Sequence, residues 1–309
     1  MVPDRVGFFY SLVRCTEDSS MEEDIEIKII TRSGLDFGIT KDIPKFWFDG
    51  DPFKSRLFDV HSLITPSGEG FFIRCLRAYK DQISDEQLKD DVKKFIFQEG
   101  QHSIQHGASN ERFKAQGIDV DLIAKKLQKD TEEARLRLPK KFAMAVTAAS
   151  EHITTITAYT VLERPELFAG ADPNIYSLYA WHCIEEFEHR SVCFDVMQKV
   201  AGTGYFTRVI ALLIATMLFQ GQVIRFMNMF LRHDGFSFWQ RMGIWCRGLK
   251  WLYGRNGYLR SQLKLYVAYF HPKYHPSNFG EESGYNRWLK EFERSNDPLM
   301  ASKAVMERI

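Results

Sequence analysis

The chain of 309 residues is 45% apolar and 26% charged, with a formal net charge of +1. An apolar fraction of this size excludes an intrinsically disordered chain. It is large enough for the core of one large helical domain or of a bundle with additional segments. The five cysteines form no Cys-x-x-Cys pair, which indicates a reducing compartment and free, buried thiols. No long apolar run follows Asp4 and Arg5, so we expect no secretory leader and a cytoplasmic location.

The first part of the chain predicts an extension followed by two helical segments. Residues 1–43 should form the extension, in which the strand-like residues 25–30 form a hairpin or pack over the bundle. Residues 51–52, Asp-Pro, predict the start of a helix. Residues 66–68, Pro-Ser-Gly, should break this helix, and a further apolar helix should then run to about Ile83.

More helices follow between further breakers. Residues 84–87, Ser-Asp-Glu-Gln, are typical of a capping box and should open the second bundle helix. A connection near Gly117 should lead to a polar helix that ends near Pro139. An almost uncharged helix is predicted over residues 142–162, and the fourth bundle helix over residues 174–199.

Two copies of Glu-x-x-His carry the strongest functional signal. Glu99 and His102 form the first copy, and Glu186 and His189 form the second. A Glu and a His three residues apart lie about 60° apart around a helix, so both side chains leave it on the same side. Four-helix di-iron and di-manganese proteins bind their metals with two such helices and one further Glu from each of two others.

Glu151 and Glu69 are the candidates for the two further carboxylates. In residues 142–162 only Glu151 and His152 could carry a charge near neutral pH, so this helix should be buried on most sides. A buried carboxylate needs a partner, because burying it unpaired costs several kcal/mol. Glu69 lies near the start of an apolar helix, where a Glu can also serve the helix dipole. The predicted metal ligands are therefore Glu69, Glu99, His102, Glu151, Glu186 and His189.

Two more histidines fall on the same helix faces as the motifs. His106 lies seven residues after Glu99, and His182 lies seven residues before His189. Seven residues return a side chain to within about 20° of its starting direction. His106 and His182 are each either an additional metal ligand or a residue that supports the ligands.

Three polar residues next to the predicted glutamate ligands have other expected roles. Gln98 and Glu185 directly precede the two motif glutamates, and each could hydrogen-bond a metal-bound histidine across the bundle. His152 follows Glu151 and points about 100° away from it, so we interpret His152 as structural.

Several short stretches are together specific enough to indicate a family. They are Trp47-Phe-Asp-Gly-Asp-Pro-Phe53, Pro66-Ser-Gly-Glu-Gly-Phe-Phe72, Phe95-Ile-Phe-Gln-Glu-Gly-Gln-His102 with His106 and Asn110, Glu151-His152, and Trp181-His-Cys-Ile-Glu-Glu-Phe-Glu-His189. With them the chain resembles a ferritin-like family described as predicted metal-dependent hydrolases, closely over roughly residues 35–196 and more loosely over the rest. The spacing of His182, Glu186 and His189 is also similar to the last ligand helix of di-iron arylamine N-oxygenases.

The C-terminal region is strongly basic. Residues 196–280 contain eleven Lys and Arg and one acidic residue, Asp234, for a net +10 that leaves −9 on the rest of the chain. Residues 209–224 are uncharged, but they are shorter than the ~20 residues that span a bilayer. The simpler interpretation is an extra helical layer on the bundle or at a homodimer interface. The alternative is a peripheral surface for the inner face of a membrane. The dense apolar content argues against nucleic-acid binding.

We therefore predict an all-α, ferritin-like four-helix bundle over residues 44–200, with additional C-terminal helices over residues 201–309. The bundle should hold two metal ions, iron first and manganese second, because carboxylates and imidazoles without thiolates suit these metals. The predicted reaction is the oxidation of a small organic or acyl-type, lipid-like substrate by dioxygen. A dinuclear metal-dependent hydrolase and a non-enzymatic metal-binding protein are the alternatives.

Overall fold

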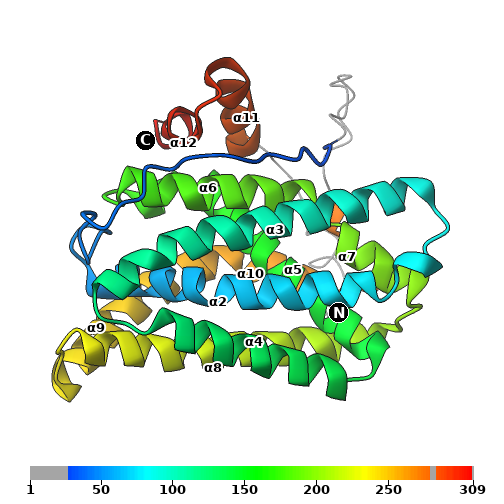
Figure 1. Ribbon diagram of the computed structural model, residues 1–309, viewed down its shortest axis with the longest axis horizontal. Helices are drawn as coiled ribbons and strands as arrows, with labels where there is room; N and C mark the ends of the chain where they lie inside the picture. The colour runs from blue at the N-terminus through cyan, green and yellow to red at the C-terminus, as the bar shows by residue number, and fades with distance from the viewer. Residues whose placement is uncertain (1–26, 279–282, 308–309) are drawn as a thin grey trace, which may run out of the picture.

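The computed structural model describes residues 27–278 and 283–307, and this part of the chain is all-α, as predicted (Figure 1). Within it, Phe48 and Ala171 form an isolated bridge and no residue lies in a β-strand. The α-helices in chain order are α2 (Pro52–Arg77), α3 (Glu86–Ala115), α4 (Val120–Arg137), α5 (Lys140–Glu163), α6 (Pro173–Glu188), α7 (Val192–Asp195), α8 (Tyr205–His233), α9 (Phe238–Tyr253), α10 (Tyr258–Ala268), α11 (Ser283–Ser295) and α12 (Pro298–Met306). Shorter helical turns lie at Lys80–Gln82, Pro165–Phe168, Val196–Val200 and Pro276–Asn278.

Four long helices, α2, α3, α5 and α6, form the central bundle. Helix α2 packs against α3 and α5 packs against α6, while α2 also contacts α5 and α3 contacts α6. Helix α4 lies in the long connection between α3 and α5 and packs on α2. One long crossover between the second and third bundle helices is consistent with the expected ferritin-like arrangement.

The helices after α7 add further layers to this bundle. Helices α8 and α10 pack on α5, and α9 packs on α2 and α10. Helices α11 and α12 pack on each other, and α12 also contacts α6. Figure 1 places α11 and α12 on the opposite side of the bundle from α8 and α9. The predicted additional helices are therefore present, while the division of the chain into an extension, a bundle and a C-terminal region remains a prediction.

The first described residues run as extended chain over the bundle rather than in a strand. Ile27 packs against the core, and the backbone N–H of Ile30 donates to Glu188 Oε2 on α6 at 3.0 Å. Of the two alternatives for the strand-like segment, residues 27–30 follow the second and pack over the bundle. Residues 25–26 lie outside the described residues.

The predicted start of α2 is confirmed, and a motif residue just before it is buried. The Asp51 carboxylate caps the helix by accepting a hydrogen bond from the Phe53 N–H at 2.7 Å. Upstream, the Trp47 indole N–H donates to Asp59 Oδ1 at 2.9 Å. This hydrogen bond joins the segment before the cap to the second turn of α2. The start of the helix is therefore fixed both by the Asp51 cap and by the bond between Trp47 and Asp59.

The start of α3 differs from the prediction by one residue. Its cap is Asp85, whose carboxylate accepts a hydrogen bond from the Leu88 N–H at 3.0 Å. Ser84 does not form the expected capping box. An aspartate cap also places a negative charge at the positive end of the helix dipole, which favours it over the neighbouring serine.

The prediction of one helix over residues 174–199 is wrong, because α6 ends at Glu188. His189 is the residue after the helix, with φ −101° and ψ 10°, and α7 begins three residues later. The His189 ring contacts side chains of α3 and α5. Contacts with other helices therefore override the local preference to continue the helix at this point.

Helix α2 continues through Pro66 to Arg77, so the predicted break at this proline is also wrong. Proline has no N–H, which leaves the carbonyl of Ser62, four residues earlier, without its helical partner. The side-chain amide of Asn110 on α3 donates to this carbonyl at 3.0 Å. A neighbouring helix thus replaces the lost hydrogen bond, and α2 stays helical up to Glu69 and beyond.

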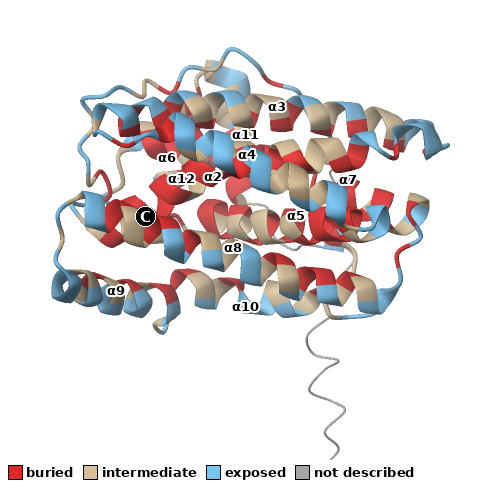
Figure 2. Cartoon of the chain, turned by 60° about the horizontal axis from the view of Figure 1, so that its bottom comes forward, coloured by how far each residue is buried: buried red, intermediate tan, exposed pale blue. Residues whose placement is uncertain are grey.

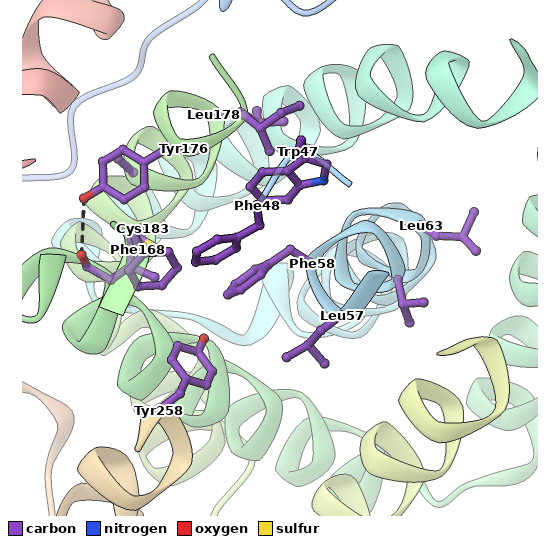
Figure 3. Close-up of a cluster of buried hydrophobic side chains, with 14 of the residues drawn as sticks. Trp47, Phe48, Leu57, Phe58, Leu63, Phe168, Tyr176, Leu178, Cys183 and Tyr258 are labelled. Carbon is purple, nitrogen blue, oxygen red and sulfur yellow. Dashed lines mark hydrogen bonds between the residues drawn. The ribbon is translucent and has the colours of Figure 1, made fainter. Parts of the chain in front are cut away.

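Two hydrophobic clusters lie at different levels along the bundle. In α2, buried apolar residues from Phe53 to Ile64 belong to the first cluster, and those from Phe71 to Leu76 belong to the second. Figure 3 shows part of the first cluster. Glu69 lies between the two sets, and α3 and α5 each have a similar gap between their cluster residues. The gap marks the level at which the bundle can place polar side chains.

We expect Asn110→Ala to lower the free energy of unfolding by about 1–3 kcal/mol, because it leaves the Ser62 carbonyl buried without a donor. Pro66→Ala restores a backbone N–H to that carbonyl, so Asn110→Ala should cost less in the Pro66→Ala background. Chemical denaturation of the four proteins of this double-mutant cycle measures the difference. Asn286→Ala, at an exposed position on α11, is the control. An equal cost in both backgrounds would contradict the assignment.

Candidate metal centre

Six side chains from the four bundle helices meet at the level between the two hydrophobic clusters. They are Glu69 from α2, Glu99 and His102 from α3, Glu151 from α5, Glu186 from α6, and His189 directly after α6. Each is at most 3% exposed. These are the six predicted metal ligands, and the structure brings all of them together.

Three overlapping groups of side chains could each hold a metal ion, because their ligand atoms lie within 4.8 Å of one another. The groups are Glu69 with His102 and His182, Glu99 with Glu151 and His189, and Glu99 with His102 and Glu186. The third group shares a member with each of the other two, so the three form one continuous cluster. His182 is part of it, whereas His106 is in none of the groups.

His189 presents its Nε2 to three carboxylates. This nitrogen lies 3.3 Å from Glu99, 3.5 Å from Glu151 and 3.7 Å from Glu186. The other ring nitrogen, Nδ1, lies 2.8 Å from the side-chain oxygen of Gln98. The Gln98 amide nitrogen donates to other groups, so its oxygen is the acceptor and His189 Nδ1 carries the proton. His189 Nε2 is therefore left to bind a second proton or a metal ion.

His102 faces the cluster with the opposite nitrogen. Its Nδ1 lies 3.5 Å from Glu69 Oε1 and 3.8 Å from Glu186 Oε1. Its Nε2 lies 3.2 Å from Glu185 Oε2, and the other oxygen of Glu185 accepts a hydrogen bond from Arg32. This contact is an ion pair that lacks hydrogen-bond geometry. Of the two hydrogen bonds expected across the bundle, the one between Gln98 and His189 is present, whereas Glu185 contacts His102 without one.

A chain of hydrogen bonds orients His182. The Asn110 amide donates to the Ser62 backbone, so its oxygen accepts from the Ser62 hydroxyl at 2.9 Å. That hydroxyl must then accept from His106 Nδ1, 2.9 Å away, which leaves His106 Nε2 as an acceptor. His106 Nε2 lies 2.8 Å from His182 Nδ1, so His182 carries its proton there. His182 Nε2, 3.1 Å from Glu186, is left facing the cluster. His106 thus supports His182.

Arg32 and Glu188 complete the outer contacts and were not predicted from the sequence. Arg32 forms ion pairs with Glu185 at 3.1 Å and with Glu188 at 2.6 Å. Glu188 also accepts a hydrogen bond from Gln98. Glu188 lies inside the second motif, about 200° around the helix from Glu186, so an outward role could have been inferred. Arg32 lies in the extended chain, where no spacing rule indicates a role.

The atoms that converge in the cluster suit cations. Buried atoms without a hydrogen bond include Glu69 Oε1, both oxygens of Glu99 and of Glu151, Glu186 Oε2, His102 Nδ1 and His189 Nε2. Leaving such groups buried and unpaired costs several kcal/mol. Four carboxylates carry four negative charges when ionised, which two divalent ions would balance. The residues present therefore fit metal ions.

Protons take the place of cations when no metal is bound. Burial, and then the charge of Glu151, raises the pKa of Glu99 well above its ordinary value. Burial, and then the charge of Glu186, raises the pKa of Glu151 to about 7. Burial alone lowers the pKa of a histidine, but the facing carboxylates raise the pKa of His102 to about 10 and that of His189 to about 9.

The cysteines and His152 stand apart from the cluster. Cys75, Cys183 and Cys193 are buried, as expected, but Cys246 is exposed, so the prediction of buried thiols is wrong for this residue. No candidate group among the described residues contains a cysteine, and Cys15 lies outside those residues. His152 Nδ1 lies 2.9 Å from the Tyr274 hydroxyl, on the side facing the loop after α10, in agreement with a structural role.

The fold and the cluster define a helical-bundle protein with a buried carboxylate and imidazole site for metal. A protein-family profile described as predicted metal-dependent hydrolase matches residues 31–280. The chain belongs to this family. No curated protein and no solved structure matches the chain significantly. The family match continues through α10, where we expected only a looser resemblance, so the basic helices α8, α9 and α10 belong to the family pattern.

We expect carefully loaded protein to contain two metal equivalents per chain, and His102→Ala and His189→Ala each to lose at least one of them. The helices should persist, because the apolar stripes are untouched. His271→Ala, at an exposed position, is the matched control. Elemental analysis with circular dichroism makes the comparison. Full occupancy in both cluster variants, or a single zinc in the parent protein, would show that the assignment is wrong.

We expect metal-free protein to lose stability as the pH rises from 4.5 to about 10. Because the pKa of Glu151 is raised in the folded state, ionisation of this carboxyl destabilises the fold increasingly as the pH rises above the ordinary pKa of 4.5. This destabilisation reaches its full size above about pH 7. The raised pKa values of His102 and His189 stabilise the fold below 6.5, and this contribution is lost as the pH passes about 9 and 10. All three effects have the same sign.

Thermal unfolding of metal-free and metal-loaded protein across this pH range measures the effect. The loaded protein should change less, because metal ions replace the protons on the ligands. Glu151→Gln removes one titrating group, so its metal-free form should be less sensitive near pH 7 than the parent. Parallel curves for the metal-free and the loaded protein would rule out this account of the cluster.

Proposed function

We propose that the protein is a dinuclear-metal enzyme that oxidises an apolar or acyl-type substrate with dioxygen. The observation that carries the proposal is the position of the cluster at the inner end of an apolar cavity. The carboxylate-rich ligand set supports iron, with manganese as the second choice. The overlap of the three candidate groups supports two neighbouring ions.

The cavity has a volume of about 570 Å³ and lies between α2, α4, α5 and α8. Its inner wall includes Glu69, His182 and Glu186 from the cluster, and most of its other lining residues are apolar. Leu218 on α8 and Ala134 on α4 line it and are exposed, which places its mouth between these two helices. A substrate in the cavity would approach the cluster from the side of Glu69 and His182.

The lining residues would do most of the work of recognition. Phe71, Val146 and Ile153 provide an apolar surface for a hydrocarbon chain and keep water away from the cluster. Two bound iron ions would supply electrons for the activation of dioxygen. The group of Glu99, Glu151 and His189 does not line the cavity, so the substrate would meet one side of the cluster only.

Hydrolysis is the second candidate, and the family description favours it. In that case the same carboxylates would bind two ions, and a bound water would attack an ester or phosphate. A metal store without catalysis is less well supported, because the cluster borders a cavity large enough for a substrate. The two enzymatic candidates need the same residues but different metals and co-substrates.

Anaerobic loading with ferrous iron, followed by exposure to oxygen in the presence of long-chain acyl compounds, separates these candidates. An oxidative enzyme should show transient optical bands and should place an atom of labelled dioxygen in the product, or remove hydrogen from it. A hydrolase should instead cleave acyl esters without oxygen when loaded with zinc or magnesium. Turnover under strict anaerobiosis with no response to oxygen would overturn the oxidative proposal.

A cavity variant keeps this test specific. Ile153→Trp should fill part of the cavity and remove turnover while leaving the metal content unchanged, because Ile153 lines the cavity but is not a ligand. Leu122→Trp, on the exposed side of α4, is the matched control and should keep full turnover. Equal activity of the two variants would remove the cavity from the proposal.

A further inference from the structure

The outer side of α8, α9 and α10 is unusually apolar for a surface. Fourteen of the twenty large hydrophobic residues that are exposed in the described chain lie between Tyr205 and Val267. They include Phe206, which is 78% exposed, and Trp239, which is 79% exposed. Figure 2 shows exposed residues along α8, α9 and α10. An exposed apolar area this concentrated marks an interaction surface.

The exposed charges on these helices are all positive. Exposed cations are found on each helix and in the loop after α9, and they are Arg225, Arg232, Arg247, Lys250, Arg255, Arg260 and Lys264. The acidic residue of this region, Asp234, has a fully buried side chain that pairs with Arg56 and Lys45. The surface therefore combines apolar residues with cations that no exposed acid on α8, α9 or α10 balances.

A second cavity shows that the three helices expose one common face. It has a volume of about 310 Å³ and is apolar. Its lining includes residues that are also exposed, namely Ile224 from α8, Leu249 and Tyr253 from α9, and Leu263 from α10. These residues surround one mouth. Ile153 and Phe219 line both this cavity and the one beside the metal cluster, so the two cavities adjoin.

We propose that the outer face of α8, α9 and α10 docks on an anionic lipid bilayer. Exposed apolar and aromatic side chains would enter the interface, and the surrounding cations would contact the anionic head groups. Helix α8 is long and apolar enough to span a bilayer by composition, but its other side packs on α5. The buried Arg208 also ties its first turn to the backbone of residues 269 and 271. The helix therefore lies on the membrane instead of crossing it.

Charge favours a bilayer over a second copy of the chain as the partner. Two such faces brought together would place cations against cations, with no exposed acid on either face to pair with them. An anionic bilayer neutralises the same charges. The rest of the chain is negative, with −9 outside residues 196–280, so the molecule would approach the membrane with this face first.

The position of this face indicates how a substrate would reach the proposed active site. Both cavity mouths border α8, so a bilayer under this helix would bring acyl chains to the openings. Ile153 and Phe219 then separate the outer cavity from the one that reaches the cluster. This route rests on the proposed function, whereas the docking itself does not require the metal site.

Sedimentation of the full chain with vesicles tests the docking. The protein should pellet with vesicles of phosphatidylglycerol and phosphatidylcholine at low salt, and less so at high salt, where charges are screened. It should stay in the supernatant with phosphatidylcholine alone. The emission of Trp239, compared with a Trp239→Phe variant, should shift to the blue on binding, because the indole leaves water. Recovery in the supernatant with anionic vesicles at low salt would overturn the proposal.

A pair of charge reversals makes the test specific. Arg247→Glu with Lys250→Glu should weaken binding by roughly 30-fold or more, since each cation near an anionic surface contributes about fivefold. Lys93→Glu with Lys290→Glu makes the same charge change at exposed positions on α3 and α11, and it should have little effect. Equal losses in the two pairs would show general charge attraction and overturn the assignment to this face.

Two further measurements separate the possible failures. His189→Ala, which should lose at least one metal equivalent, should still pellet as the parent protein does, so the docking can hold even if the proposed chemistry is wrong. In analytical ultracentrifugation without lipid, we expect no dimer that forms through this face, that is, no dimer that the Trp239→Ser substitution dissociates. Such a dimer would assign the face to a second copy of the chain and overturn the bilayer.

Discussion

Four glutamates meet inside the bundle, each at most 3% exposed, and this burial is the constraint on which the rest of the structure depends. Carboxylates that lie this close repel one another, and the surrounding apolar helices leave them little contact with solvent. Only cations or protons can hold them together. The four glutamates lie at the level between the two hydrophobic clusters, where they interrupt the apolar core least.

The groups around the cluster decide which nitrogen of each histidine faces it. For His182 the orientation begins at Pro66, which frees a backbone carbonyl that the Asn110 amide satisfies. The amide orientation of Asn110 sets the direction of the Ser62 hydroxyl, and through His106 it sets the proton on His182. A proline in mid-helix, which by itself would weaken α2, thus helps to orient a candidate ligand on another helix.

The parts of this structure that were predictable are local in the sequence. The spacing of Glu99 and His102 places both on one side of a helix whatever surrounds it, and the lone Glu151 stands out in an uncharged helix. The continuity of α2 through Pro66 was not predictable, because the hydrogen bond that permits it comes from a residue 48 positions away. The end of α6 before His189 and the role of Arg32 likewise depend on distant contacts. The basic and apolar character of α8 to α10 was visible in the sequence, but its exposure was not.

The outer partners of the two motif histidines are unlike in charge. Glu185, a carboxylate, contacts His102, whereas Gln98, a neutral amide, contacts His189. A carboxylate behind an imidazole makes the ring a stronger electron donor, and an amide does so much less. A metal ion bound beside His102 would therefore be more electron-rich than one bound beside His189. The side of the cluster that borders the cavity, with Glu69 and His182, would thus differ in its electronic character from the side formed by Glu99 and Glu151.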